Sequence, residues 1–176
     1  MTIALTDRAP AFALPGTDGH THSLADYSDA ATLVIIQTCN HCPYARAWEG
    51  RINAIQSDYA AQGVRIVAIS SNDADAYPED SFPEMVARAA AQGYTFDYLH
   101  DDDQSVARAL GAERTPEVFV FDAERRLAYH GAVDDNRDDQ AVTQHYLRDA
   151  LDAVLAGRAP SPSETPAVGC TVKWRG

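Results

Sequence analysis

The chain has 176 residues, 45% of them hydrophobic, which predicts one globular domain with a substantial core rather than a disordered segment. Its 14 basic and 26 acidic residues give a net charge of −12, which argues against nucleic acid or an anionic membrane as a partner because acidic surfaces repel phosphates. No run approaches the roughly 18 apolar residues of a membrane span, and the first residues lack a secretory-signal pattern, so we expect a cytoplasmic protein.

The first part of the chain predicts a hairpin, a buried strand and a helix. Residues 11–27 place apolar groups on both sides of a Thr-Asp-Gly turn, which is typical of a small β-hairpin. Residues 32–37, TLVIIQ, form a β-branched run that indicates a central strand. The next helix is predicted to begin at Pro43 and to end near Gly63. Its apolar stripe predicts a buried face made by Tyr44, Trp48, Ile52, Ile55 and Tyr59.

The rest of the chain alternates strands and helices before a terminal hairpin and helix. We predict strands over 64–72 and 94–101, helices over 79–92 and 104–111, an antiparallel strand pair within 117–131, and a last helix over 139–156. This order predicts an α/β protein with a mixed central sheet and helices on both faces. Residues 1–157 then form the domain, with 1–31 as an N-terminal hairpin extension, and residues 158–176 form a linker and C-terminal tail.

Cys39 and Cys42 stand two residues apart where the predicted central strand ends and the helix begins. Three cysteines do not make a disulfide framework, and in a reducing compartment a close pair is typically catalytic or metal-binding. The unpaired N–H groups of a helix N-terminus stabilise a thiolate, which is the reactive form of cysteine. We therefore predict that Cys39 attacks a disulfide and that Cys42 resolves the mixed disulfide. His41 is predicted to lower the pKa of Cys39 and to favour the dithiol form.

These motifs resemble a known superfamily. The sequence CNHC after a buried strand resembles the thioredoxin superfamily, and FALPGTDGHTHSLADY is similar to the N-terminal hairpin of its AhpC/TSA-like, membrane-anchored-thioredoxin-like branch. RTPEVFVFDAERRLAYHGAVDD resembles the later half of that branch, so the resemblance spans residues 8–155. It implies a thioredoxin-like fold, a cis Pro116 facing the cysteines, and backbone groups of Thr115 that bind a peptide. Asn40 and Pro43, beside the pair, are the other substrate-binding residues expected.

The chain departs from the thioredoxin pattern in two ways. The strand before the cysteines carries no acid, so the proton acceptor for Cys42 is unassigned; Glu117 is one candidate, although an acid at a solvated strand edge is the expectation we favour. The tail GCTVKWRG lies outside the thioredoxin core and resembles the end of a group of redoxins in this branch. Its Cys170 is either a thiol without a role or a third redox thiol that exchanges with the pair.

The function predicted from these features is thiol–disulfide oxidoreduction on a disulfide-containing protein or small-thiol substrate. A reductant or thioredoxin-type donor is the expected second partner, and no cofactor or metal is expected. One alternative is a peroxiredoxin-like peroxidase, although Cys39 stands where such enzymes carry the threonine of Thr-x-x-Cys. The other is a metal-binding or metal-delivery protein, because Cys39 and Cys42 have the spacing of half a zinc site that His41 or Cys170 would complete.

Overall fold

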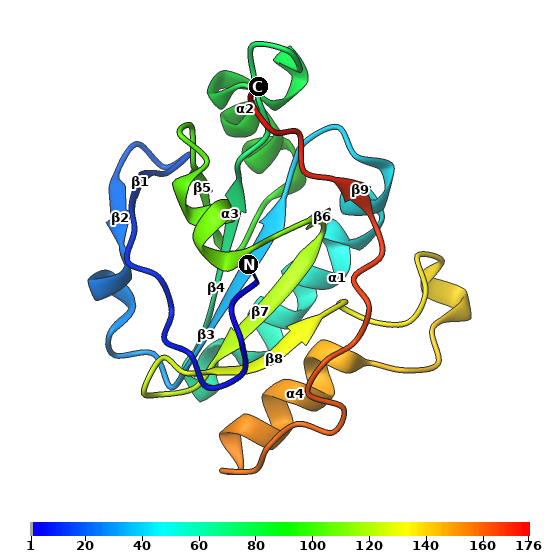
Figure 1. The fold of residues 1–176 in the computed structure, drawn as a ribbon. Coiled ribbons are helices and arrows are strands. Elements are labelled where there is room, and N and C mark those ends of the chain that lie inside the picture. The colour runs from blue at the N-terminus through cyan, green and yellow to red at the C-terminus, as the bar shows by residue number, and fades with distance from the viewer. Residues whose placement is uncertain (1) are drawn as a thin grey trace.

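The computed structural model describes residues 2–176, and a five-stranded mixed sheet lies at its centre (Figure 1). The strand order across this sheet is β5–β4–β3–β7–β8. β3 is parallel to β4, and β4 to β5, whereas β7 runs antiparallel to both β3 and β8. The five strands are β3 (Thr32–Thr38), β4 (Val64–Ser70), β5 (Asp97–His100), β7 (Glu117–Phe121) and β8 (Leu127–Gly131).

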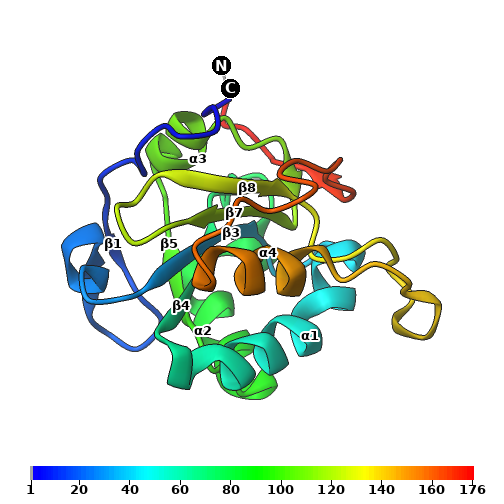
Figure 2. The ribbon, with the colours of Figure 1, turned by 90° about the horizontal axis from the view of Figure 1, so that it is seen from below.

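Helices cover both faces of this sheet, as the sequence predicts (Figure 2). The four α-helices are α1 (Pro43–Tyr59), α2 (Phe82–Gln92), α3 (Ser105–Leu110) and α4 (Tyr146–Leu155). Successive side chains of β3 point to opposite faces. Leu33 and Ile35 therefore pack with α3 and the N-terminal segment, whereas Val34 and Ile36 pack with α1 and α4. The thioredoxin-like α/β architecture is confirmed.

The predicted hairpin and first helix are present. The hairpin pairs β1 (Ala13–Pro15) with β2 (Thr21–Ser23) and leads into the 3₁₀ turn η1 (Leu24–Tyr27). Helix α1 begins at Pro43 and continues through η2 (Ala60–Gln62) to Gly63, which takes a left-handed φ of 81°. The predicted stripe is buried except for the half-buried Tyr44, which confirms it as a core face.

The last helix is shorter than predicted. A helix over 139–156 is wrong at its start, because only the 3₁₀ turn η4 (Asp139–Ala141) forms before the chain extends and α4 begins at Tyr146. Asp138 accepts a hydrogen bond from the Gln140 N–H, and Asp135 accepts one from the Thr143 N–H. These aspartates bind backbone groups that an early helical turn would otherwise use.

A two-residue strand near the C-terminus, β9 (Cys170–Thr171), pairs antiparallel with β6 (Arg114–Thr115). The C-terminal tail thereby returns to the segment just before β7, where Figure 1 shows β9 beside β6. A short 3₁₀ turn, η3 (Pro78–Asp80), precedes α2. Among the helices of residues 2–176, none combines the length and hydrophobicity needed to cross a membrane.

Candidate active site

The two cysteines of the CNHC motif lie in contact with the segment before β7. Cys39 follows the last residue of β3, and Cys42 is the N-cap residue of α1, so the strand–helix junction fixes both thiols. The exposed fractions are 2% for Cys39 and 0% for Cys42. The Cys39 Sγ lies 3.6 Å from the hydroxyl of Thr115, and the Cys42 Sγ lies 3.4 Å from its carbonyl oxygen. Thr115 therefore contacts both thiols.

Each of the two thiols shifts the pKa of the other. The hydrogen bond from the Cys39 S–H lowers the pKa of Cys42 to about 4, with smaller contributions from Cys170 and the Ala45 N–H, while burial opposes this shift. The same hydrogen bond, burial and the Asp80 carboxylate raise the pKa of Cys39. A hydrogen bond from the Cys42 N–H at the start of α1 lowers the pKa of Cys39, but the other contributions outweigh it. The role of Cys39 as the attacking thiol stays a prediction. The pair loses its first proton at a depressed pKa and its second at a raised one.

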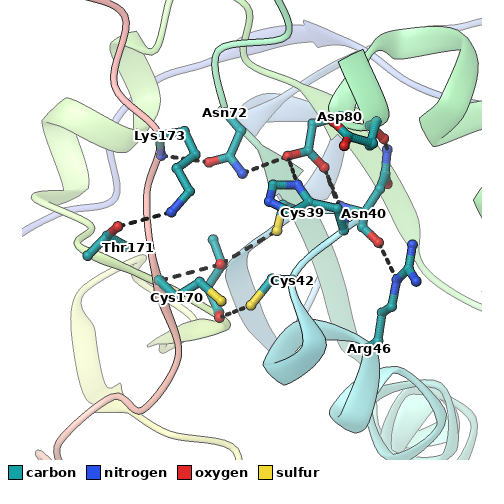
Figure 3. A network of polar contacts seen from close by, with 12 residues as sticks. Cys39, Asn40, Cys42, Arg46, Asn72, Asp80, Cys170, Thr171 and Lys173 are labelled. Carbon is teal, nitrogen blue, oxygen red and sulfur yellow. Dashed lines mark hydrogen bonds and ion pairs between the residues drawn. The ribbon is translucent and has the colours of Figure 1, made fainter. Parts of the chain in front are cut away.

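Asp80 organises the loop between the cysteines, a role that no motif of the sequence predicts. Its side chain is fully buried. One carboxylate oxygen accepts the N–H groups of Asn40 at 2.7 Å and His41 at 3.3 Å. The other accepts the His41 Nδ1–H at 2.5 Å and the Asn72 amide at 2.8 Å. Asp80 lies about forty residues beyond the motif, near the start of the helix predicted over 79–92, and only the fold brings it here, as Figure 3 shows. That helix begins later than predicted, at Phe82, because residues 78–80 form the 3₁₀ turn η3.

His41 is held on two sides. Its ring stacks on Tyr77 with centroids 5.6 Å apart, and its Nδ1 donates to Asp80. Side-chain ligand atoms of Cys39, His41 and Asp80 all lie within 4.8 Å of one another. The imidazole is thus close enough to the Cys39 sulfur to influence it, and its effect on reactivity stays a prediction.

The other two predicted substrate-binding residues, Asn40 and Pro43, differ in solvent exposure. Asn40 is buried, its amide donates to the Glu79 carbonyl and accepts from the Tyr98 hydroxyl, and its own carbonyl accepts from Arg46 Nε. These bonds use Asn40 to hold the loop, and its contact with a substrate stays a prediction. Pro43 is exposed at the first position of α1.

The segment at Thr115 contains the cis proline that the resemblance implies, and the C-terminal tail pairs with its backbone. The Thr115–Pro116 peptide bond is cis, as predicted, and Pro116 is buried. The backbone of Thr115 pairs with Cys170 of the tail. The Cys170 thiol contacts Cys42, as Figure 3 shows, so the structure brings all three cysteines of the chain together.

Glu117 is not a solvated edge residue, and that expectation is wrong. Its side chain is buried because the loop before β6 and the ring of His130 cover it. One carboxylate oxygen accepts the N–H groups of Glu113 and Arg114, and the other lies 2.6 Å from His130 Nε2. These contacts shape the entry to β6, and a role as proton acceptor for Cys42 stays a prediction.

The possible metal ligands near the motif differ from the predicted set. The structure groups Cys39 with His41 and Asp80, whereas the sequence pairs Cys39 with Cys42. His41 Nδ1 and Asp80 already form a direct hydrogen bond in this group. A metal ion would have to separate these two atoms to bind both.

The chain is similar in sequence to a known protein family and to a mycobacterial protein. The sequence profile described as "AhpC/TSA family" matches residues 5–130. A Mycobacterium tuberculosis (strain H37Rv) protein named as a candidate peroxiredoxin, Rv2521, is 36% identical over 116 residues, which are 64% of this chain and 67% of that protein.

Two solved structures resemble nearly the whole chain, tail included. The hypothetical protein SMc02350 from Sinorhizobium meliloti 1021 is 42% identical with a TM-score of 0.94, covering 99% of this chain and 97% of that one. An uncharacterized conserved protein from Geobacillus kaustophilus is 40% identical with a TM-score of 0.92, covering 98% and 93%. A candidate thiol:disulfide interchange protein DsbE from Chlorobium tepidum shares only the fold, at 21% identity and a TM-score of 0.65 over 89% and 98% of the two chains.

Proposed function

The chain belongs to the AhpC/TSA family of thioredoxin-like redox proteins, and we propose that it is a thiol–disulfide oxidoreductase. In this proposal Cys39 and Cys42 cycle between a dithiol and a disulfide, exchanging with a protein or small-thiol disulfide and then with a thiol donor. A reducing cytoplasm is the compartment in which such a dithiol stays active.

The observation that carries the proposal is the placement of two thiols at the N-terminus of α1, where both contact Thr115 beside its cis peptide bond to Pro116. A depressed first pKa keeps one thiolate populated at neutral pH, and the thiolate is the species that attacks a disulfide. The lowered pKa of Cys42 favours it as the attacking sulfur, whereas the sequence predicts Cys39 in that role.

Reduction of insulin disulfides by the reduced protein tests the activity, with the cysteine state mapped by mass spectrometry before and after. We expect a Cys39–Cys42 disulfide to accumulate as insulin is reduced, and both Cys39→Ser and Cys42→Ser to lose turnover. An unreacted dithiol in the presence of excess insulin would contradict the proposal. Brief alkylation at neutral pH assigns the roles, because Cys42 should react before Cys39.

A thiol peroxidase is the second candidate, favoured by the low pKa of a buried Cys42 and by the name of the M. tuberculosis relative. Hydrogen peroxide consumption measured on the same preparation separates the two. Peroxide turnover that outpaces insulin reduction would favour the peroxidase. The metal-binding alternative is tested by metal analysis of the purified reduced protein, in which a stoichiometric metal lost in Cys39→Ser would support it.

A further inference from the structure

The C-terminal tail lies against the active site as an ordered strand rather than a loose end. Besides the pairing of Cys170 with Thr115, the Val172 N–H donates to the Glu113 carbonyl at 3.0 Å, and the Val172 side chain is only 3% exposed. Further along, the Lys173 carbonyl accepts the Asp73 N–H at 2.9 Å. Backbone pairing and a buried apolar side chain together are the way in which an added strand is held at a sheet edge.

The contacts continue from the tail into the CNHC loop. The side-chain oxygen of Asn72 accepts the Lys173 N–H at 2.9 Å, and the Asn72 amide donates to Asp80 at 2.8 Å. Asp80 in turn holds the backbone between the two cysteines. Figure 3 shows this path from Lys173 through Asn72 to Asp80, beside the three sulfur atoms.

Gly169 shows how closely the tail approaches. A Cβ at this position would lie 2.2 Å from the Thr115 carbonyl oxygen and 3.2 Å from the Pro116 nitrogen. Only glycine lets the two backbones come this near, so the residue before Cys170 is matched to the docked position. At the C-terminus, Gly176 has open space around its Cβ position.

We propose that the tail is a built-in substrate strand and that Cys170 relays disulfide exchange between external substrates and the buried Cys39–Cys42 pair. This inference rests on the proposed oxidoreductase function. The pair is closed off from solvent while the tail is docked, whereas Cys170 is partly exposed and contacts Cys42. An extended external peptide cannot pair with Thr115 while Cys170 occupies that position.

The relay reduces an external disulfide RSSR in three exchange steps. The Cys170 thiolate attacks one sulfur and releases RS⁻, and Cys42 then attacks the Cys170 sulfur and releases the second RS⁻. Cys39 attacks Cys42, which frees Cys170 and leaves a Cys39–Cys42 disulfide. The pair loses two electrons and its two protons, and RSSR takes both to become two RSH.

The raised Cys170 pKa in the dithiol state slows the first of these steps and favours the reverse direction. Burial, and then hydrogen bonding and repulsion from Cys42, raise this pKa. Formation of the Cys39–Cys42 disulfide removes the Cys42 thiolate and with it that repulsion. Cys170 therefore becomes a better nucleophile when the pair is oxidised, which lets the same steps run in reverse toward oxidation of external thiols.

The test is disulfide mapping of Cys39→Ser after mild oxidation with glutathione disulfide. We expect a Cys42–Cys170 disulfide within one chain, and its loss when Gly169→Ala is added, because the new Cβ forces the tail strand away from Thr115. Gly176→Ala in the same background is the matched control and should keep the disulfide. Cys170 recovered free in Cys39→Ser, or equal yields from the two glycine variants, would overturn the relay.

Insulin reduction separates the relay from the underlying function. Cys170→Ser should still form Cys39–Cys42 with a small oxidant but should reduce insulin more slowly than the unchanged protein. If Cys170→Ser reduces insulin at the unchanged rate, the relay is wrong and the oxidoreductase proposal stands. If the unchanged protein never forms Cys39–Cys42 with insulin, the proposed function fails, whatever disulfide Cys39→Ser forms.

Discussion

Replacing Asp80 with alanine removes the acceptor of four hydrogen bonds at the centre of the active-site loop. The Asn40 N–H and the Asn72 amide would then be buried donors without their partner, because both residues are nearly inaccessible to solvent. A buried donor left without its partner costs about 1–3 kcal/mol in free energy of unfolding, so the two together are expected to cost about 2–6 kcal/mol. For a chain of this length that corresponds to a fall in Tm of roughly 4–24 °C.

Asp80→Asn is expected to be milder. Its remaining carbonyl oxygen can keep the two backbone N–H groups of Asn40 and His41, but the bonds lose their charge assistance, at a cost of roughly 1–3 kcal/mol. Urea unfolding of the reduced proteins at neutral pH, followed by circular dichroism, measures both values.

Glu79→Gln is the matched control, because Glu79 is adjacent in sequence and exposed. It should leave the free energy of unfolding within about 0.5 kcal/mol of the unchanged protein. If Asp80→Ala lost no more stability than Glu79→Gln, the conclusion that Asp80 holds the loop would be refuted.

Two further predictions concern the thiols. The pKa of Cys42 in the folded dithiol lies below the value of about 8.5 for an unfolded cysteine. The Cys42 thiolate therefore contributes to folding stability, fully above about pH 8.5 and progressively less as the pH falls toward about 4. Thiolate absorbance at 240 nm should reveal one low-pKa thiol, and Cys39→Ala should raise that pKa. An unchanged titration would contradict the role of Cys39 in lowering it. His41→Pro removes a hydrogen-bond donor to Asp80, whose negative charge raises the pKa of Cys39, so that pKa should rise further. The reduction potential should then fall by about 30 mV per pKa unit, measured against glutathione buffers. A potential that stays the same or rises would make His41 a spacer only.

The sequence by itself determined the elements whose signals are local. The β-branched run of β3 and the apolar stripe of α1 each satisfy one backbone periodicity over many residues, so few alternatives compete with them. Pro43 marks the start of the helix because its ring fits the first turn, and this is enough to place the two cysteines at a strand–helix junction. The predicted start of the last helix is wrong because the side chains of Asp135 and Asp138 accept hydrogen bonds from backbone N–H groups there. Hydrophobic periodicity carries no information about such side-chain hydrogen bonds.

Tertiary structure alone decided how the site is assembled. Asp80 and Cys170 reach the motif across about forty and about 130 residues of chain, and no local pattern encodes contacts over such separations. Glu117 is a charged residue of a type usually exposed at strand edges. The loop before β6 and His130 cover it, so it is a buried hydrogen-bond acceptor. Only the fold brings the Cys42 side chain into contact with both Cys39 and Cys170, and these contacts contribute to lowering its pKa. Local periodicity sets which elements form, whereas burial and charge at the site depend on what the rest of the chain packs against them.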